Sequence, residues 1–130
     1  VIQIYRREKI MEDIRNEQKE ALETLVEFNE KLVKNMNIIV KELSGQRLDD
    51  TDKFLKGIID AVNWEVQVLN GTMSLLNEDK ERINKEQFNS KIVNFGEAIK
   101  ENDDTKMAAA IKELIPEFEN LGESAKEVIK

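Results

Sequence analysis

The chain has 130 residues, of which 40% are hydrophobic and 36% charged, and its formal net charge is −7. This length gives one domain with one core, and five Gly and a single Pro predict long helices with few loops. The negative charge excludes nucleic acid and anionic membrane as expected partners.

The first predicted helix runs from about residue 10 to 43. Its apolar residues recur three or four apart, which is the period of one helix face, and Ser44-Gly45 gives a glycine suited to the position after a C-terminus. At about 1.5 Å per residue this helix is on the order of 50 Å long.

The second predicted helix, about residues 51–77, has one narrow polar stripe and is apolar over most of its circumference, so it needs cover on more than one side. One of its apolar seams contains small residues that allow another helix to approach closely. That helix belongs either to the same bundle or to a partner. We predict a candidate partner groove along this seam, formed by Phe54, Gly57, Ala61, Trp64, Val68, Gly71 and Leu75.

Two shorter helices follow, at about 85–100 and 104–129. Asn84 is the predicted N-cap of the first, and Asp103 or Asp104 that of the second. Pro116 lacks a backbone donor, so we expect a kink or a brief break near Leu114 to Ile115.

These helices predict an all-α fold, a four-helix up-down-up-down bundle with a long first helix and a Pro-kinked fourth helix, in a single domain spanning 1–130. The first helix exceeds the third by so much that one of its ends must overhang. We expect a homodimer to cover that overhang.

The sequence offers no catalytic residues, because it has no His and no Cys and none of its serines lies in a nucleophile motif. We therefore expect a non-enzyme without cofactor or metal. The acidic run at 49–52 does not continue as a calcium loop and fits helix capping. No apolar run is long enough to span a membrane, and without cysteine we expect a cytoplasmic protein.

Two residues of the second helix admit a functional interpretation. Glu65 lies between the two apolar seams, and we favour a position at the rim, or a pair with a lysine, over a buried carboxyl with a shifted pKa. For Trp64, the sole tryptophan, we favour a place in the core over an exposed anchor for a partner.

Three segments carry a resemblance to known proteins: Ile58 to Trp64, Ala98 to Asp103, and Leu114 to Glu119. Over roughly residues 54–122 the chain resembles small, uncharacterised, all-helical proteins of Gram-positive bacteria, some of them associated with motility genes. That group usually has an acidic, tyrosine-containing segment before the proline, which is absent here. The resemblance implies a helical fold and a link to flagellar or surface-protein assembly, without catalytic residues.

We hypothesise a non-enzymatic interaction module, an adaptor or an export-chaperone-like bundle that holds a partner's amphipathic helix beside its second helix. The alternative is a small-molecule sensor or carrier with a pocket lined by Phe88, Phe95, Trp64 and Phe118. A third possibility is a dimerisation module from a longer protein. The first residue, Val1, allows such a fragment, and Met11 is a conceivable natural start.

Overall fold

The computed structural model describes residues 2–130 and consists of four helices joined by short loops. The helices are α1 (Ile2–Leu43), α2 (Thr51–Leu76), α3 (Lys85–Glu101) and α4 (Asp104–Ile129). No strand occurs among these residues. The predicted all-α four-helix bundle is therefore confirmed.

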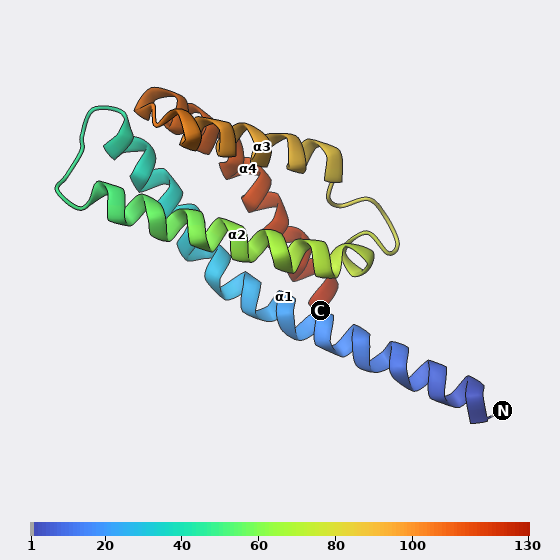
Figure 1. Ribbon diagram of the computed structural model, residues 1–130. Coiled ribbons are helices and arrows are strands. Elements are labelled where there is room, and N and C mark those ends of the chain that lie inside the picture. The colour runs from blue at the N-terminus through green and yellow to red at the C-terminus, as the bar shows by residue number, and fades with distance from the viewer. Residues whose placement is uncertain (1) are drawn as a thin grey trace.

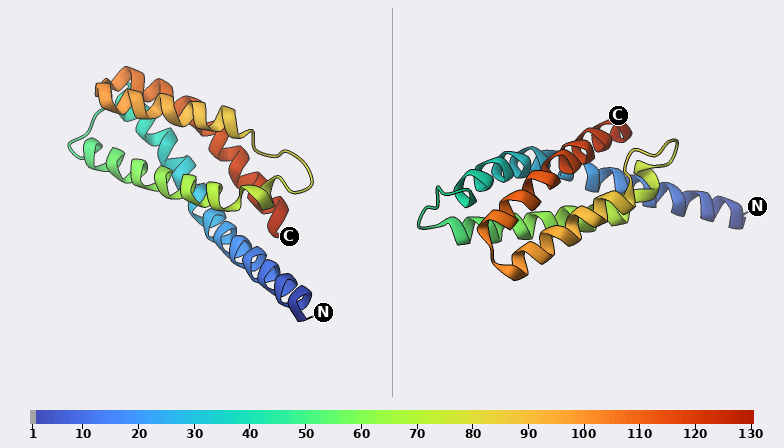
Figure 2. Two further views of the ribbon diagram at one scale, coloured as in Figure 1. Left: turned by 45° about the vertical axis from the view of Figure 1, so that its right-hand side comes forward. Right: turned by 90° about the horizontal axis from the view of Figure 1, so that it is seen from above.

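Successive helices run in opposite directions, which gives the up-down-up-down order (Figure 1). α1 packs most extensively on α4 and next on α2, and α3 packs on α4. Two further views show the same arrangement, with the N-terminal part of α1 projecting beyond the other helices (Figure 2). The predicted overhang is present.

The start of the first helix was predicted wrongly, because α1 begins at Ile2 and not near residue 10. Residues 2–9 contain neither Gly nor Pro, so helical backbone continues through them, although every residue from 2 to 17 is exposed. The prediction followed the apolar periodicity, which Arg7 interrupts on the N-terminal side of Ile10. The ends of the other helices lie within one residue of the predicted ones.

Most of the predicted helix ends are confirmed. The Asn84 side chain accepts a hydrogen bond from the Gln87 amide at 3.0 Å, and the Asp103 side chain accepts one from the Lys106 amide at 3.1 Å. Gly45 follows α1 with a φ of +107°, a conformation that favours glycine. Asp104 does not cap α4; it accepts hydrogen bonds from the Arg47 guanidinium, the shorter at 2.6 Å, and so ties the first loop to α4.

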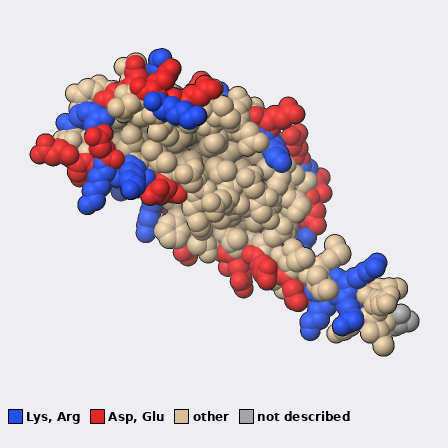
Figure 3. Space-filling view, in the orientation of Figure 1, with Lys and Arg blue, Asp and Glu red and all other residues tan. Residues whose placement is uncertain are grey.

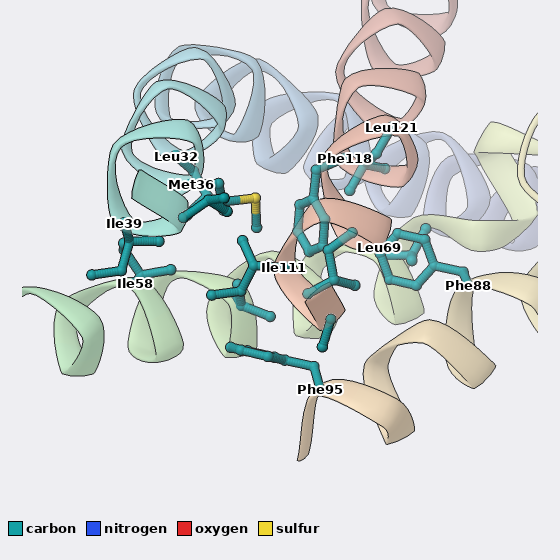
Figure 4. Packing of buried hydrophobic residues seen from close by; sticks show 14 of the residues in the cluster. Leu32, Met36, Ile39, Ile58, Leu69, Phe88, Phe95, Ile111, Phe118 and Leu121 are labelled. Carbon is teal, nitrogen blue, oxygen red and sulfur yellow. The ribbon is translucent and has the colours of Figure 1, made fainter. Parts of the chain in front are cut away.

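All four helices contribute to one apolar core, which Figure 4 shows from close by. Phe88 of α3 and Phe118 of α4 lie with their ring centroids 5.3 Å apart, and both are almost fully buried. Met36 and Ile39 bring α1 to the same cluster. The core forms because apolar residues three and four apart in the sequence give each helix one apolar face.

Pro116 does not break its helix, since α4 is continuous from Asp104 to Ile129. Of the two predicted alternatives near Leu114, the brief break is therefore absent, whereas a kink is compatible with a continuous helix. Leu114 and Phe118 on either side of the proline are completely buried, so packing against the core holds this turn helical although the proline removes one backbone donor. Within the described residues, no helix is both long and apolar enough to cross a membrane.

Candidate functional site

A groove of about 970 Å³ lies between α1 and α2. Its apolar lining comes from both helices: Phe28, Leu32, Phe54, Ile58, Ala61 and Trp64. Charged residues of both signs stand around it: Lys31, Asp50, Lys53 and Asp60. The groove has the volume and the apolar lining with a few polar groups that are typical of binding sites.

Trp64 and Phe28 form the aromatic part of this groove. Their rings meet edge to face with centroids 5.5 Å apart, which is a favourable geometry for an aromatic pair. The Trp64 side chain is 37% exposed and Phe28 is 53% exposed. The predicted place of Trp64 in the core is therefore wrong: α3 and α4 fill the core from the other side, so that this seam of α2 stays open.

The predicted groove is present only in its N-terminal half. Four of its residues line the groove: Phe54, Gly57, Ala61 and Trp64. Two of the other three are covered by their own chain, since Leu75 is 3% exposed and Val68 is half-buried. Gly71 is exposed, although its carbonyl accepts a hydrogen bond from Gln18 of α1. The reason is that α1 crosses α2 and closes this seam toward the C-terminal end of α2.

The glycines of the seam do not serve packing within the chain. A Cβ atom built on Gly57 or Gly71 meets nothing within 4 Å. At Gly57, therefore, no helix of the same bundle takes the place of a side chain. At Gly71, Gln18 of α1 reaches the backbone carbonyl at 3.1 Å. A glycine in a helix costs roughly 1 kcal/mol relative to alanine, and at Gly57 no contact inside the chain offsets that cost.

Glu65 lines the same groove as the aromatic pair but is only 1% exposed, so the predicted rim position is wrong. Its Oε1 accepts a hydrogen bond from Asn29 Nδ2 at 2.9 Å, whereas its Oε2 is buried without a partner. Burial raises the pKa of this carboxyl to about 7, although the Asn29 hydrogen bond opposes the shift. The lysine pair expected for Glu65 is not formed.

Asn29 connects Glu65 to the fourth helix, because the same amide also donates to the Phe118 carbonyl at 3.0 Å. Gly122 lies directly opposite, and a Cβ atom there would collide with Asn29 Oδ1. These residues form a polar link through α1, α2 and α4. Sequence reasoning missed Asn29, although a polar residue three before Leu32 on a buried face is a signal for such a link.

The alternative pocket of four aromatic residues is not formed. Phe88, Phe95 and Phe118 are each at most 3% exposed and pack within the core. Trp64 lies in the groove on α2. In residues 2–130 no cluster of three or more acidic side chains has the arrangement of a metal site, and Asp52 and Asp104 both bind Arg47.

Taken together, the fold and the groove define a four-helix bundle with an open apolar seam between α1 and α2. The chain belongs to the family described as a domain of unknown function (DUF8042), whose model matches residues 20–124. The match begins close to Leu22, the first buried residue of α1. No curated protein and no solved structure matches the chain.

Proposed function

We propose that this protein is a non-enzymatic interaction module, an adaptor or export-chaperone-like bundle that holds an apolar helix of a partner protein in the groove between α1 and α2. The observation that carries the proposal is the exposed pair Trp64 and Phe28 in an apolar groove beside a glycine that packing within the chain does not require. Exposed aromatic residues at the centre of a groove are typical anchors of helix recognition.

Gly57 is the residue that supports a helical occupant most directly. It lines the groove and has open space in place of a side chain, so the backbone of another helix is able to approach α2 there. A small residue at a helix surface has this effect because the distance between two helices depends on the side chains at their contact. Cytoplasmic location, self-association and a link to motility or surface-protein assembly belong to the same proposal.

Replacing Gly57 with leucine is expected to block the groove without harming the fold. The new side chain enters open space and leucine favours helix, so we expect stability to stay equal or to rise by about 0.5 to 1 kcal/mol. Binding of the partner is expected to weaken at least tenfold, or about 1.4 kcal/mol, because leucine occupies the volume of the approaching helix. The measurement is quantitative affinity purification from the source cell, with thermal unfolding of each variant.

Gly96→Leu is the matched control, because Gly96 lies on α3 outside the groove and also faces open space. A partner that is retained by the wild type and by Gly96→Leu but lost by Gly57→Leu supports the proposal. If every captured protein is equally retained by all three, the groove has no role in binding.

A small molecule is the second candidate occupant, because a groove of about 970 Å³ with aromatic lining falls in the size range of ligand sites. Trp64 is the sole tryptophan and lines the groove, so its fluorescence reports occupancy directly. A shift of its emission on adding lipophilic metabolites, absent in Gly57→Leu, favours this second function.

A further inference from the structure

The N-terminal sixteen residues of the described part of α1 form a projecting helix. Only its last part touches the bundle: Arg15 pairs with Glu78 at 2.6 Å, and Ile14 lines a hollow beside Leu75. We call residues 2–17 the overhang; every one of them is exposed. Six of its large apolar side chains are between 50% and 76% exposed: Ile2, Ile4, Tyr5, Ile10, Met11 and Ile14. At about 1.5 Å per residue the overhang is about 24 Å long, and Figure 1 shows it beyond the ends of all the other helices.

The apolar row of the overhang is the continuation of the row that packs on α2. In steps of three and four, positions 4, 7, 11, 14, 18, 21, 25, 28 and 32 keep a seven-residue repeat along α1. Within the bundle its members Leu25 and Leu32 are buried, and Gln18 donates hydrogen bonds to α2. On the N-terminal side of Gln18 the row continues past the end of α2, where Glu78, two residues after that end, forms an ion pair with Arg15. A sustained seven-residue repeat is the pattern of helices that pair along their length.

The charges of the overhang differ between its two halves. Residues 2–9 have three basic side chains and one acidic, whereas residues 10–17 have three acidic and one basic. Figure 3 shows the basic groups gathered near the far end of the projecting helix and acidic groups where it leaves the bundle. An identical helix laid alongside in the opposite direction therefore brings each basic half next to an acidic half. Laid in the same direction, like charges meet.

We propose that two copies of this chain associate through their overhangs, which pair as antiparallel helices about a two-fold axis. Each copy covers the apolar row of the other, and the opposite halves attract across the interface. Arg7, a polar residue within the row, favours one alignment over others, as polar residues do in coiled coils. The inference rests on the self-association part of the proposed function and not on the groove.

The charge pattern gives a test by reversal. Arg6→Glu with Arg7→Glu makes both halves acidic, and Glu12→Lys with Asp13→Lys makes both basic. We expect sedimentation equilibrium to show a dimer for the wild type and a dissociation constant raised at least about tenfold for each double variant. The quadruple variant reverses both halves and is expected to restore the dimer, because the antiparallel pair is again complementary.

The direction of pairing is tested by cross-linking, for which the absence of cysteine leaves a clean background. With a short flexible bis-maleimide, Ile4→Cys is expected to cross-link to Ile14→Cys in a mixture more than to itself. Preferential self-linking of Ile4→Cys would mean parallel helices and overturn the inference. Ile4→Glu, in the same row but far from the bundle and 64% exposed, is expected to weaken the dimer while circular dichroism and thermal unfolding of the bundle stay unchanged.

Two other results also overturn the inference. One is a monomer at all micromolar to millimolar concentrations, and the other is a dimer that ignores every charge variant. Gly57→Leu separates this inference from the groove: the dimer is expected to persist in that variant. If the dimer is lost in Gly57→Leu, the second copy occupies the groove and not the overhang.

Discussion

Gly122→Ala is expected to destabilise the protein by about 2 to 4 kcal/mol, although glycine to alanine normally stabilises a helix. A Cβ atom at this position collides with Asn29 Oδ1 and approaches Asn29 Cγ to 3.1 Å. The asparagine must then leave its place, and with it the hydrogen bonds to Glu65 and to the Phe118 carbonyl. Because Glu65 is buried with no other partner for its carboxyl, its polar atoms are left unsatisfied.

The effect is expected to change sign when Asn29 is replaced. The three nearest atoms that a methyl group at residue 122 would meet all belong to the Asn29 side chain. Asn29→Ala alone is expected to cost about 1 to 3 kcal/mol, because Glu65 loses its donor. In the Asn29→Ala protein, Gly122→Ala is expected to raise the free energy of unfolding by up to about 1 kcal/mol, because alanine has the higher helix propensity.

Denaturant unfolding of the wild type, the two single variants and the double variant measures this coupling as a double-mutant cycle. Gly96→Ala is the matched control for helix propensity, because its Cβ atom enters open space. Strictly additive free energies, or a Gly122→Ala protein as stable as Gly96→Ala, would contradict the contact between Gly122 and Asn29.

The second large effect concerns pH: the stability of the wild type is expected to fall by about 2 to 3 kcal/mol from pH 5 to pH 8. Burial raises the pKa of Glu65 from 4.5 in the unfolded chain to about 7 in the folded protein. Between these values the folded state holds a proton that the unfolded state has lost. Stability therefore decreases as pH rises through this window and becomes constant above it.

The charged groups near Glu65 do not reverse this expectation. Two lysines and two aspartates line the same groove: Lys31, Lys53, Asp50 and Asp60. The hydrogen bond to the Glu65 carboxyl, however, comes from Asn29. Beside Asn29, a second hollow is lined by three acids and one lysine: Glu30, Glu119, Glu123 and Lys126. An excess of acids near a buried carboxyl favours its neutral form.

Glu65→Gln is expected to remove this pH dependence, because the amide keeps the shape and does not titrate. The measurement is urea unfolding of both proteins at several values between pH 5 and 8. Carboxylates paired with arginines do not titrate in this window, because the arginines lower their pKa values: Glu78, Asp79, Asp104 and Glu127. Their contribution to stability is lost only at lower pH.

A wild type whose stability is flat over this window, or a Glu65→Gln variant with the same slope, would mean that the folded carboxyl titrates like an exposed one. In that case water reaches Glu65 through the groove. The predicted loss of partner binding in Gly57→Leu is independent of this outcome. It depends on the exposed ring of Trp64 and on the open space at Gly57, not on the protonation of Glu65.

The sequence alone determined the fold class, the four helices and most of their ends. Those properties depend on local chemistry: apolar residues three and four apart, capping side chains such as Asn84 and Asp103, and the glycine after α1. The overhang also followed from the sequence, since it needs only the lengths of the helices. What the periodicity did not give is the start of α1, because Arg7 interrupts the apolar row and the first turn has no acidic residue to mark the helix start.

Only the tertiary structure decided which apolar face of α2 is covered. The seam of Trp64 and the seam of Leu69 have similar residues, but α3 and α4 pack on one side and α1 crosses the other, so Leu75 is enclosed and Trp64 stays half-open. The crossing also buries Glu65 beside Asn29, a residue 36 positions away. Sequence spacing gives the face on which a residue lies, but the crossing of two helices decides whether anything covers it.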